Sequence, residues 1–292
     1  MNLLRSRFRN REALRLYRDE DESSVLNLVH ADRLPGQPAV HVSDLRHATR
    51  SGAAHLVAAE GFTDPYTVVT TDATGTVTGV ASYATNRSNG TGTLLWMHSE
   101  EDPEITAALL DHVRCHFGSG RRLTAFPFGT RSPLAMNGIP IRRRIVTFRA
   151  LESAGFSSLD KNYYWHAPHA RPAGQAYPVA QKVPWTSPPG WRLEMTHTDG
   201  ELTGEAYITA PLEDTAELWF LRVTPGHRGH GLGRELLQQC LAEMRSCGAV
   251  EVIARISEGH LEDPDGLVSL QRLLDNAGFA WVDCLYSLVR CP

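Results

Sequence analysis

The chain has 292 residues, of which 42% are hydrophobic and 21% charged, and its formal net charge is −4. This length allows two domains with sizeable cores, and the charge balance argues against binding to nucleic acid or to an anionic membrane. No apolar run is long enough to span a bilayer, and the arginine-rich start has no hydrophobic signal segment after it. Five cysteines without a CxxC spacing favour reduced thiols, so we expect a cytoplasmic protein.

The first half alternates predicted strands and helices. Alternating apolar residues predict strands at 14–17, 66–71, 77–83, 93–97 and 123–126. Apolar residues at three- and four-residue spacing, or acidic residues in a first turn, predict helices at 21–30, 42–51, 104–117 and 145–154. A segment with six prolines then spans 167–190 and predicts an extended linker rather than packed structure.

The second half contains a strand, a glycine-rich turn and a helix in succession. The apolar run 218–223 predicts the strand, which Pro225 ends. Apolar residues from Leu232 to Met244 share one face of the predicted helix, and Gly248 stops it. Between them, the sequence RGHGLG leaves the backbone free of side chains at the helix N-terminus. Such amides form an anion cradle that suits phosphate.

Three phosphate-binding motifs share this general form. A P-loop requires Gly-Lys-Ser/Thr, but the chain has Gly233-Arg234-Glu235. A dinucleotide fingerprint requires its glycines directly after the strand, but Gly226, His227 and Arg228 intervene. The third pattern, V-x-P-x-x-R-G-x-G-x-G, fits from Val223 onward and resembles the acyl-CoA pyrophosphate loop of the GCN5-related N-acetyltransferase (GNAT) superfamily. An ordinary glycine-rich turn is the alternative.

The resemblance implies specific roles for these residues. It places acetyl-CoA, as the donor substrate, on strand and loop residues Leu221, Arg222, Val223, Arg228, Gly229, His230, Gly231, Leu232, Gly233 and Arg234. Histone-type members of the superfamily carry their general base at the position of Glu217, with the same spacing to the loop. A solvated carboxylate at the strand end is the alternative for Glu217. The resemblance implies no metal.

The two halves also resemble each other. A constant shift places Tyr66 on Trp191 and Gly75 on Gly200. A slightly smaller shift places Leu95-Trp96 on Leu218-Trp219, and then LESAGF (151–156) on LDNAGF (274–279) without a gap. These matches predict two copies of one α/β unit.

The copies differ at the loop. The same gap-free register places Arg228 on Ile105, Gly231 on Ala108, Gly233 on Leu110 and Glu217 on Leu94. We therefore expect a degenerate unit at 1–167, a proline-rich linker at 168–190 and an acyl-CoA-binding unit at 191–292. Each unit is predicted to be a mixed sheet flanked by helices.

Several other residues are candidates for catalysis or binding. Many GNAT enzymes have a tyrosine as general acid where this chain has Leu274, and an asparagine where it has Leu267, so Ser257, Glu258, His260 and Tyr286 remain open for that role. His112 and His116 have a metal-binding spacing, but half-buried histidines explain them better. Arg142–Arg144 could meet an acidic acceptor or a CoA phosphate, or form a solvated face, and His227 and His230 could help to neutralise phosphate.

The sequence thus predicts an acyl-CoA-dependent N-acyltransferase that transfers acetyl to an amine of a small molecule. An acyl-CoA-binding or regulatory module without turnover and a protein or peptide N-acetyltransferase are the alternatives. No nucleic-acid or membrane partner is expected.

Overall fold

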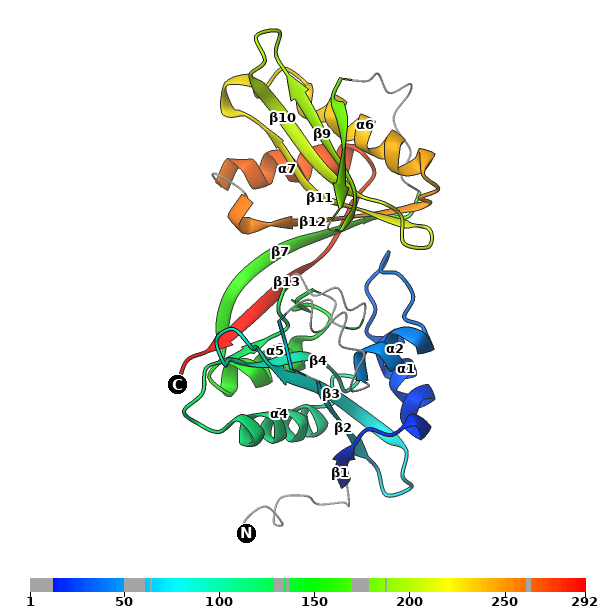
Figure 1. Ribbon diagram of the computed structural model, residues 1–292, viewed down its shortest axis with the longest axis vertical. Coiled ribbons are helices and arrows are strands. Elements are labelled where there is room, and N and C mark those ends of the chain that lie inside the picture. The colour runs from blue at the N-terminus through cyan, green and yellow to red at the C-terminus, as the bar shows by residue number, and fades with distance from the viewer. Residues whose placement is uncertain are drawn as a thin grey trace. The chain divides into compact units, whose positions relative to one another are not determined.

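The computed structural model describes residues 13–49, 61–63, 65–128, 134, 137–169, 179–186, 188–260 and 264–292. The chain forms two compact units (Figure 1). The first comprises Met1–Arg33, Ala39–Leu159 and Leu285–Pro292, and the second Leu34–Pro38 and Asp160–Cys284. Among the described residues, no helix is long and apolar enough to cross a membrane.

The first unit is a mixed sheet with helices on both faces. Its strands are β1 (Ala13–Leu16), β2 (Tyr66–Thr71), β3 (Val77–Thr85), β4 (Gly92–His98), β5 (Leu123–Ala125) and β6 (Ile139–Pro140), with part of β13 (Ala280–Arg290). Its helices are α1 (Glu22–Ala31), α2 (Val42–Thr49), α4 (Pro103–Phe117) and α5 (Ile145–Ser153).

Alternating apolar residues of this sheet fill two cores. Val69, Val80 and Trp96 face α1 and α2, whereas Val68 and Ala81 face α4 and α5. Because strand side chains alternate between faces, one strand supplies both cores. The predicted strands and helices of this half all occur, with ends that differ by at most a few residues.

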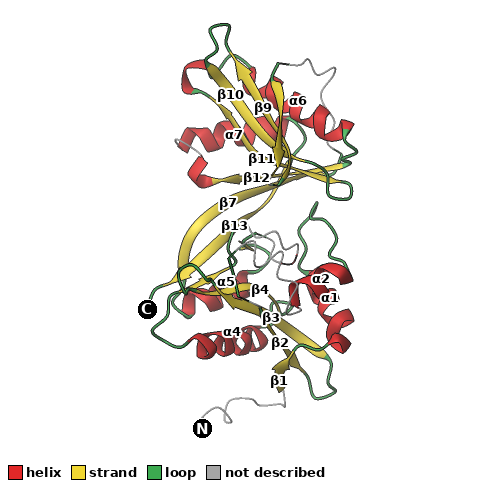
Figure 2. Ribbon diagram, viewed as in Figure 1, coloured by secondary structure: helices red, strands yellow, loops and turns green. Residues whose placement is uncertain are grey.

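The second unit contains strands β7 (Ser157–Ala167), β8 (Gln181–Thr186), β9 (Pro189–Thr196), β10 (Leu202–Thr209), β11 (Thr215–Val223) and β12 (Glu251–Ser257). Its helices are α6 (Leu232–Ser246) and α7 (Pro264–Asn276) (Figure 2). Leu236, Leu237 and Cys240 of α6 pack with Leu218 of β11 and Leu270 of α7 in one buried core. The opposite face of this sheet carries no helix among the described residues of the unit.

The last strand of each half of the sequence pairs with a strand from the other half. β7 closes the first half of the sequence, but it pairs antiparallel with β12, from Asn162 against Ser257 to Ala167 against Val252. β13 closes the second half, but its Leu288–Arg290 segment pairs with Leu123–Ala125 of β5. The compact units therefore differ from the boundaries expected at 167 and 191, since the second unit contains Asp160–Ala167 of β7 and the first contains Leu285–Arg290 of β13.

Part of the expected linker is a strand. Gln181–Thr186 form β8, which pairs along β9 with Gln181 against Glu194 and Thr186 against Pro189. Pro184 fits because β8 lies at the sheet edge, where a residue without an N–H is tolerated. Buried Gln239 holds the approach to this strand, because its Oε1 accepts from the amides of Val179 and Ala180 at 2.8 Å.

Strand pairing corrects the expected register between the copies. The β3–β4 pairs pass from Trp96 to Leu94, which leaves Leu95 at a bulge. The β10–β11 pairs pass from Phe220 to Leu218, which leaves Trp219 at the corresponding bulge. Leu95 therefore matches Trp219, and the position that matches Glu217 is Thr93, not Leu94. The gap-free register was wrong because the Leu-Trp pair stands one position apart in the two strands: its Leu lies at the bulge of β4, and its Trp lies at the bulge of β11.

Candidate acyl-CoA and amine site

The glycine-rich loop forms an uncapped helix N-terminus. After β11 a 3₁₀ turn at Pro225–His227 leads into the loop, and α6 begins after Gly231. Gly229 and Gly231 have φ of 82° and 85°, in the left-handed region that favours glycine. Gly231 is the N-cap residue of α6, and no side chain caps it. The first amides of the helix therefore point out of its positive end, as anion binding requires.

Gly233 has room that the protein itself does not fill. A Cβ at this position would lie 3.6 Å from the Val223 side chain and 3.7 Å from Leu273, which is ordinary contact. Packing within the protein therefore does not require glycine at this position. Close approach of a ligand to the backbone would require it. Arg228 lies at the same turn, and its Nε donates to the carbonyl of Val223 at 3.0 Å. The loop residues thus fit a pyrophosphate group.

The corresponding helix of the first unit is capped. Asp102 is the N-cap of α4, and its carboxylate accepts from the amides of Glu104 and Ile105 at 2.8 and 3.0 Å. A protein carboxylate thus occupies the amides that a phosphate would need. Both helices have the same length, and their caps match Asp102 with Gly231, not Ala108 with Gly231 as expected. The loop before α4 is shorter, since only Ser99–Glu101 lie between β4 and its cap.

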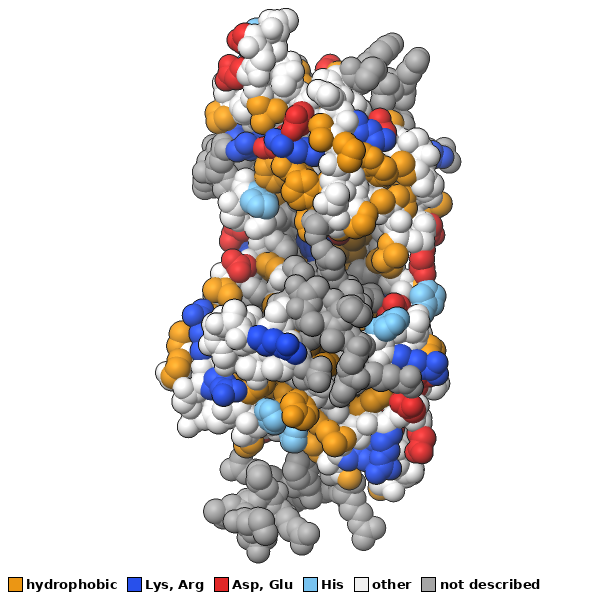
Figure 3. Space-filling model, viewed as in Figure 1, with side chains coloured by type: hydrophobic (Ala, Val, Ile, Leu, Met, Phe, Trp, Pro, Cys, Tyr) orange, Lys and Arg blue, Asp and Glu red, His pale blue; other side chains and the backbone are white. Residues whose placement is uncertain are grey.

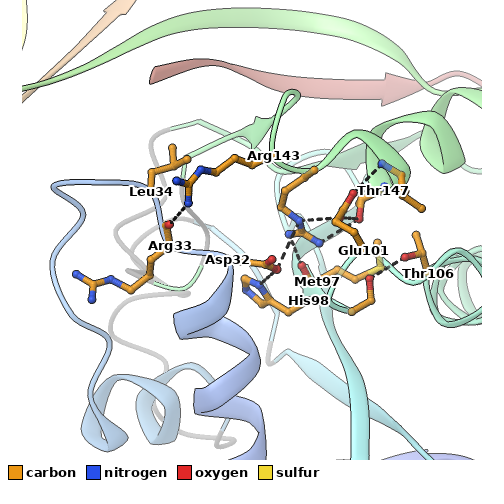
Figure 4. Close-up of polar contacts among 12 residues, drawn as sticks. Asp32, Arg33, Leu34, Met97, His98, Glu101, Thr106, Arg143 and Thr147 are labelled. Carbon is orange, nitrogen blue, oxygen red and sulfur yellow. Dashed lines mark hydrogen bonds and ion pairs between the residues drawn. The ribbon is translucent and has the colours of Figure 1, made fainter. Parts of the chain in front are cut away.

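This shorter turn places a carboxylate inside the first unit. Glu100 and Glu101 both have positive φ, 48° and 58°. The Glu101 carboxylate accepts from the amides of Val146 and Thr147 at the start of α5, at 2.7 and 3.0 Å. Figure 4 shows Glu101 beside Thr147. Arg144 Nε lies 3.1 Å from the same carboxylate.

Arg144 is buried rather than part of a solvated arginine face. Its guanidinium also donates to the carbonyl of Met97 at 2.6 Å and lies 3.5 Å from Asp32. Asp32 in turn contacts Nδ1 of buried His98 at 2.7 Å. The expectations for Arg144, contact with an acidic acceptor or a CoA phosphate or a place in a solvated face, are therefore wrong. Arg143 donates to the carbonyl of Arg33 at 2.9 Å.

In the second unit, Glu217 lies where two parallel strands separate. The β11–β12 pairs run from Thr215 against Glu251 to Leu218 against Ala254, and no later pair is formed between the described residues of the two strands. Glu217 is paired with Ile253, so both side chains share the face that carries no helix. Beyond Leu218, alternate amides of β11 face this gap instead of a partner strand.

Arg255 forms an ion pair with Glu217 at the gap. Arg255 Nε lies 2.8 Å from Glu217 Oε1, and the two side chains are only 13% and 15% exposed. Burial raises the pKa of Glu217, and the positive charge of Arg255 opposes this shift. Glu217 is thus not the fully solvated strand-end carboxylate of the alternative interpretation. Sequence analysis missed Arg255, although a lone arginine in the apolar strand EVIARIS was a usable signal.

Aromatic and charged residues continue across the same face. Tyr207, Phe220 and His260 form a row in which neighbouring ring centroids lie 5.5 and 5.1 Å apart. Beside them, the carboxylate of Glu205 contacts Arg192 at 3.0 Å and Arg222 at 2.8 Å. Figure 3 shows acidic and basic side chains next to hydrophobic ones over the second unit. Sequence analysis did not single out this cluster.

The remaining candidates lie in different places. Leu274 is fully buried in the second core, and Leu267 packs against it, so both positions are structural. Glu258 accepts from the Tyr163 hydroxyl at 2.7 Å. Tyr286 belongs to the first unit, where its ring lies 5.7 Å from that of Phe148.

The histidine candidates take part in ordinary polar and ring contacts. His112 contacts the Tyr83 hydroxyl at 3.1 Å, and His116 packs on the ring of Tyr83 at 4.8 Å. His227 contacts the Thr224 hydroxyl at 3.0 Å. His230 is exposed in the loop. None of these contacts requires a metal.

Comparison with known proteins agrees with this arrangement. The model of the acetyltransferase (GNAT) family matches residues 159–261, which include β11, the loop and α6. A mycothiol acetyltransferase from Beutenbergia cavernae is 27% identical over 215 residues, which cover 63% of this chain and 72% of that protein.

Solved structures share the fold of both units. A tandem GNAT protein from the clavulanic acid biosynthesis pathway is 16% identical with a TM-score of 0.58, over 96% of this chain and 98% of that one. A GCN5-related N-acetyltransferase from Sphaerobacter thermophilus is 14% identical with a TM-score of 0.55, over 96% and 95%. Loop, fold and family match agree: residues 159–261 match the GNAT acetyltransferase family, and both halves of the chain share the fold of a tandem GNAT protein.

Proposed function

We propose that the protein transfers an acetyl group from acetyl-CoA to the amine of a small molecule, and that the second unit does so. The observation that carries this proposal is the uncapped N-terminus of α6, with Glu217 at the point where β11 and β12 separate. Both features lie within the segment that matches the GNAT family model.

Strand and loop residues would hold the donor. The amides at 229–233 suit its pyrophosphate, and Arg228 and Arg234 add positive charge at the positive end of the helix. The backbone of Leu221, Arg222 and Val223 borders the gap beside β12 and suits the pantetheine amides. The donor would supply an activated thioester carbonyl.

Glu217 would remove the proton from the acceptor ammonium group. An amine attacks a carbonyl only when it is neutral, and a carboxylate with a raised pKa is a more effective base than a solvated one. Arg255 keeps the carboxylate ionised and oriented through the 2.8 Å ion pair. Arg255 is therefore a positioning residue in this scheme.

The acceptor would approach from the sheet face that carries no helix. The names of the relatives support acetyl transfer, and that of the mycothiol acetyltransferase supports a small-molecule product. The row of Tyr207, Phe220 and His260 offers ring surfaces, while Arg222 and Glu205 offer charges of both signs. This mixture suits a polar metabolite that carries an amine.

The direct test is the release of CoA from acetyl-CoA in the presence of primary amines. We would use glucosamine, tyramine, cysteine methyl ester and a lysine-containing peptide, and compare wild type with Glu217→Gln. The wild type should release CoA with a small amine in preference to the peptide. Glu217→Gln should lower turnover roughly 10²–10⁴-fold while acetyl-CoA affinity, measured by calorimetry, stays unchanged.

Two results would contradict the proposal. If wild type binds acetyl-CoA but releases no CoA with any of these amines, the result would favour an acyl-CoA-binding module over a transferase. If Glu217→Gln keeps the wild-type rate across pH, the carboxylate is not the base.

A further inference from the structure

Leu34–Pro38, a segment of the first half of the sequence, belongs to the second unit. It lies between α1 and α2, and its neighbours on both sides belong to the first unit. Its contacts with the second unit include His166, Ile253 and Tyr164.

Gly36 packs closely against the sheet face that carries Glu217. A Cβ on Gly36 would lie 2.4 Å from the ring of His166 on β7 and 2.6 Å from Cγ2 of Ile253 on β12. Ile253 is the strand partner of Glu217, so both side chains point to the same face. The segment therefore covers the residue next to Glu217.

Two polar contacts keep this arrangement in place. The hydroxyl of buried Tyr164 donates to the carbonyl of Pro35 at 2.8 Å. The amide of Leu34 donates to the side-chain oxygen of Gln37 at 2.8 Å, which closes the turn on itself. Beneath it, His166 is held by Glu251 at 2.8 Å.

Gly36 can hold this position only as glycine. Its φ of 77° lies in the left-handed region. Neither neighbour can move easily, since Ile253 is buried and His166 is held by its contact with Glu251. Any side chain at this position would lift the segment from the sheet.

We propose that Leu34–Pro38 forms the wall of the amine site beside Glu217, and that it selects which small amines reach the base. This inference rests on the proposed function of the second unit. It gives the first half of the chain a direct part in acceptor recognition without any part in binding acetyl-CoA.

The test separates amine recognition from donor binding. Gly36→Ala should raise the KM of the best small amine of the panel about tenfold or more, with acetyl-CoA affinity unchanged in calorimetry. Gly75→Ala is the matched control, because Gly75 has a φ of 88° but no atom within 4 Å of an added Cβ. It should leave the amine KM unchanged.

Tyr164→Phe provides a second, milder variant in case Gly36→Ala does not fold. It removes only the hydroxyl that donates to Pro35, and it should raise the amine KM several-fold and also change the ratio of rates between two amines. The inference would be overturned if wild type is active and a folded variant, Gly36→Ala or Tyr164→Phe, has the same amine KM as wild type. Loss of activity in the wild type itself would instead contradict the proposed function.

Discussion

At the scale of single residues, the pair of Glu217 and Arg255 decides how the proposed reaction depends on pH. Burial favours the neutral carboxyl and raises its pKa, while the guanidinium favours the carboxylate. Transfer requires the carboxylate. The rate should therefore rise with pH through a Glu217 pKa that lies above the ordinary glutamate value.

Arg255→Gln tests this balance. Without the cation, only a hydrogen bond from Trp219 opposes desolvation. The Glu217 pKa should therefore rise further, and the acidic limb of the kcat/KM profile should move to higher pH. Above that limb, much of the rate should return. Arg46→Gln is a suitable control, since Arg46 forms an exposed ion pair with Glu22 in the first unit. A limb that stays in place or moves to lower pH would contradict the role given to Arg255.

The sequence was informative for residues whose neighbours are close along the chain. Glu217 was singled out from its spacing to the loop, and the structure places it at the point where β11 and β12 separate. Arg144 was misjudged, because its partners Asp32 and Glu101 come from distant segments. A charged residue is expected at the surface unless such partners are known.

At the scale of elements, helices α4 and α6 show how one position can serve two purposes. The cap of α4 is a carboxylate that accepts from the first amides of its helix, whereas the cap of α6 is a glycine without a capping side chain. In the proposed function the donor would complete the hydrogen bonding of α6 from outside the protein, as Asp102 completes that of α4 from within.

Gly231→Val should abolish acetyl-CoA binding without unfolding the second unit. The substitution adds a side chain at the cradle and strains a φ of 85°. Gly248→Val is the matched control at the other end of α6, where φ is 101° and no atom lies within 4 Å of an added Cβ. Calorimetry should show binding by the control alone, and retention of wild-type affinity by Gly231→Val would refute the loop assignment.

Elements were predicted better than their pairing. Apolar periodicity reports which side chains are buried, so β2 was found at its observed ends, Tyr66 and Thr71. Periodicity does not report which strand lies next to which. β8 was taken as part of a linker because of the prolines around it, and its pairing along β9 could not be seen in the sequence. The repeat of LESAGF in LDNAGF correctly indicated the same backbone conformation in both copies, since the corresponding residues Gly155 and Gly278 have φ of 88° and 87°.

At the scale of the whole molecule, the two halves predict a single donor site per chain. The first unit lacks the long loop and holds the carboxylates of Asp102 and Glu101 on the amides of α4 and α5. Titration with acetyl-CoA should give a stoichiometry near one. Gly231→Val should reduce it to zero, and two sites per chain would show that the first unit also binds the donor.

The division of the chain into units could not be predicted from its sequence. Two similar copies imply two units. However, β7 and β13 are similar strands, and their side-chain pattern would allow each of them to complete the sheet of its own half or that of the other half. Only tertiary pairing distinguishes the two outcomes.

The exchanged closing strands have a consequence for synthesis of the chain. Leu285–Arg290 contribute to the first unit, so that unit cannot complete its sheet while the ribosome is still translating the second. Translation proceeds at roughly 5–20 residues per second, and N-terminal domains ordinarily fold first. Here the edge of β5 must wait for the last strand to emerge, and during this wait it is open to wrong partners, β7 among them.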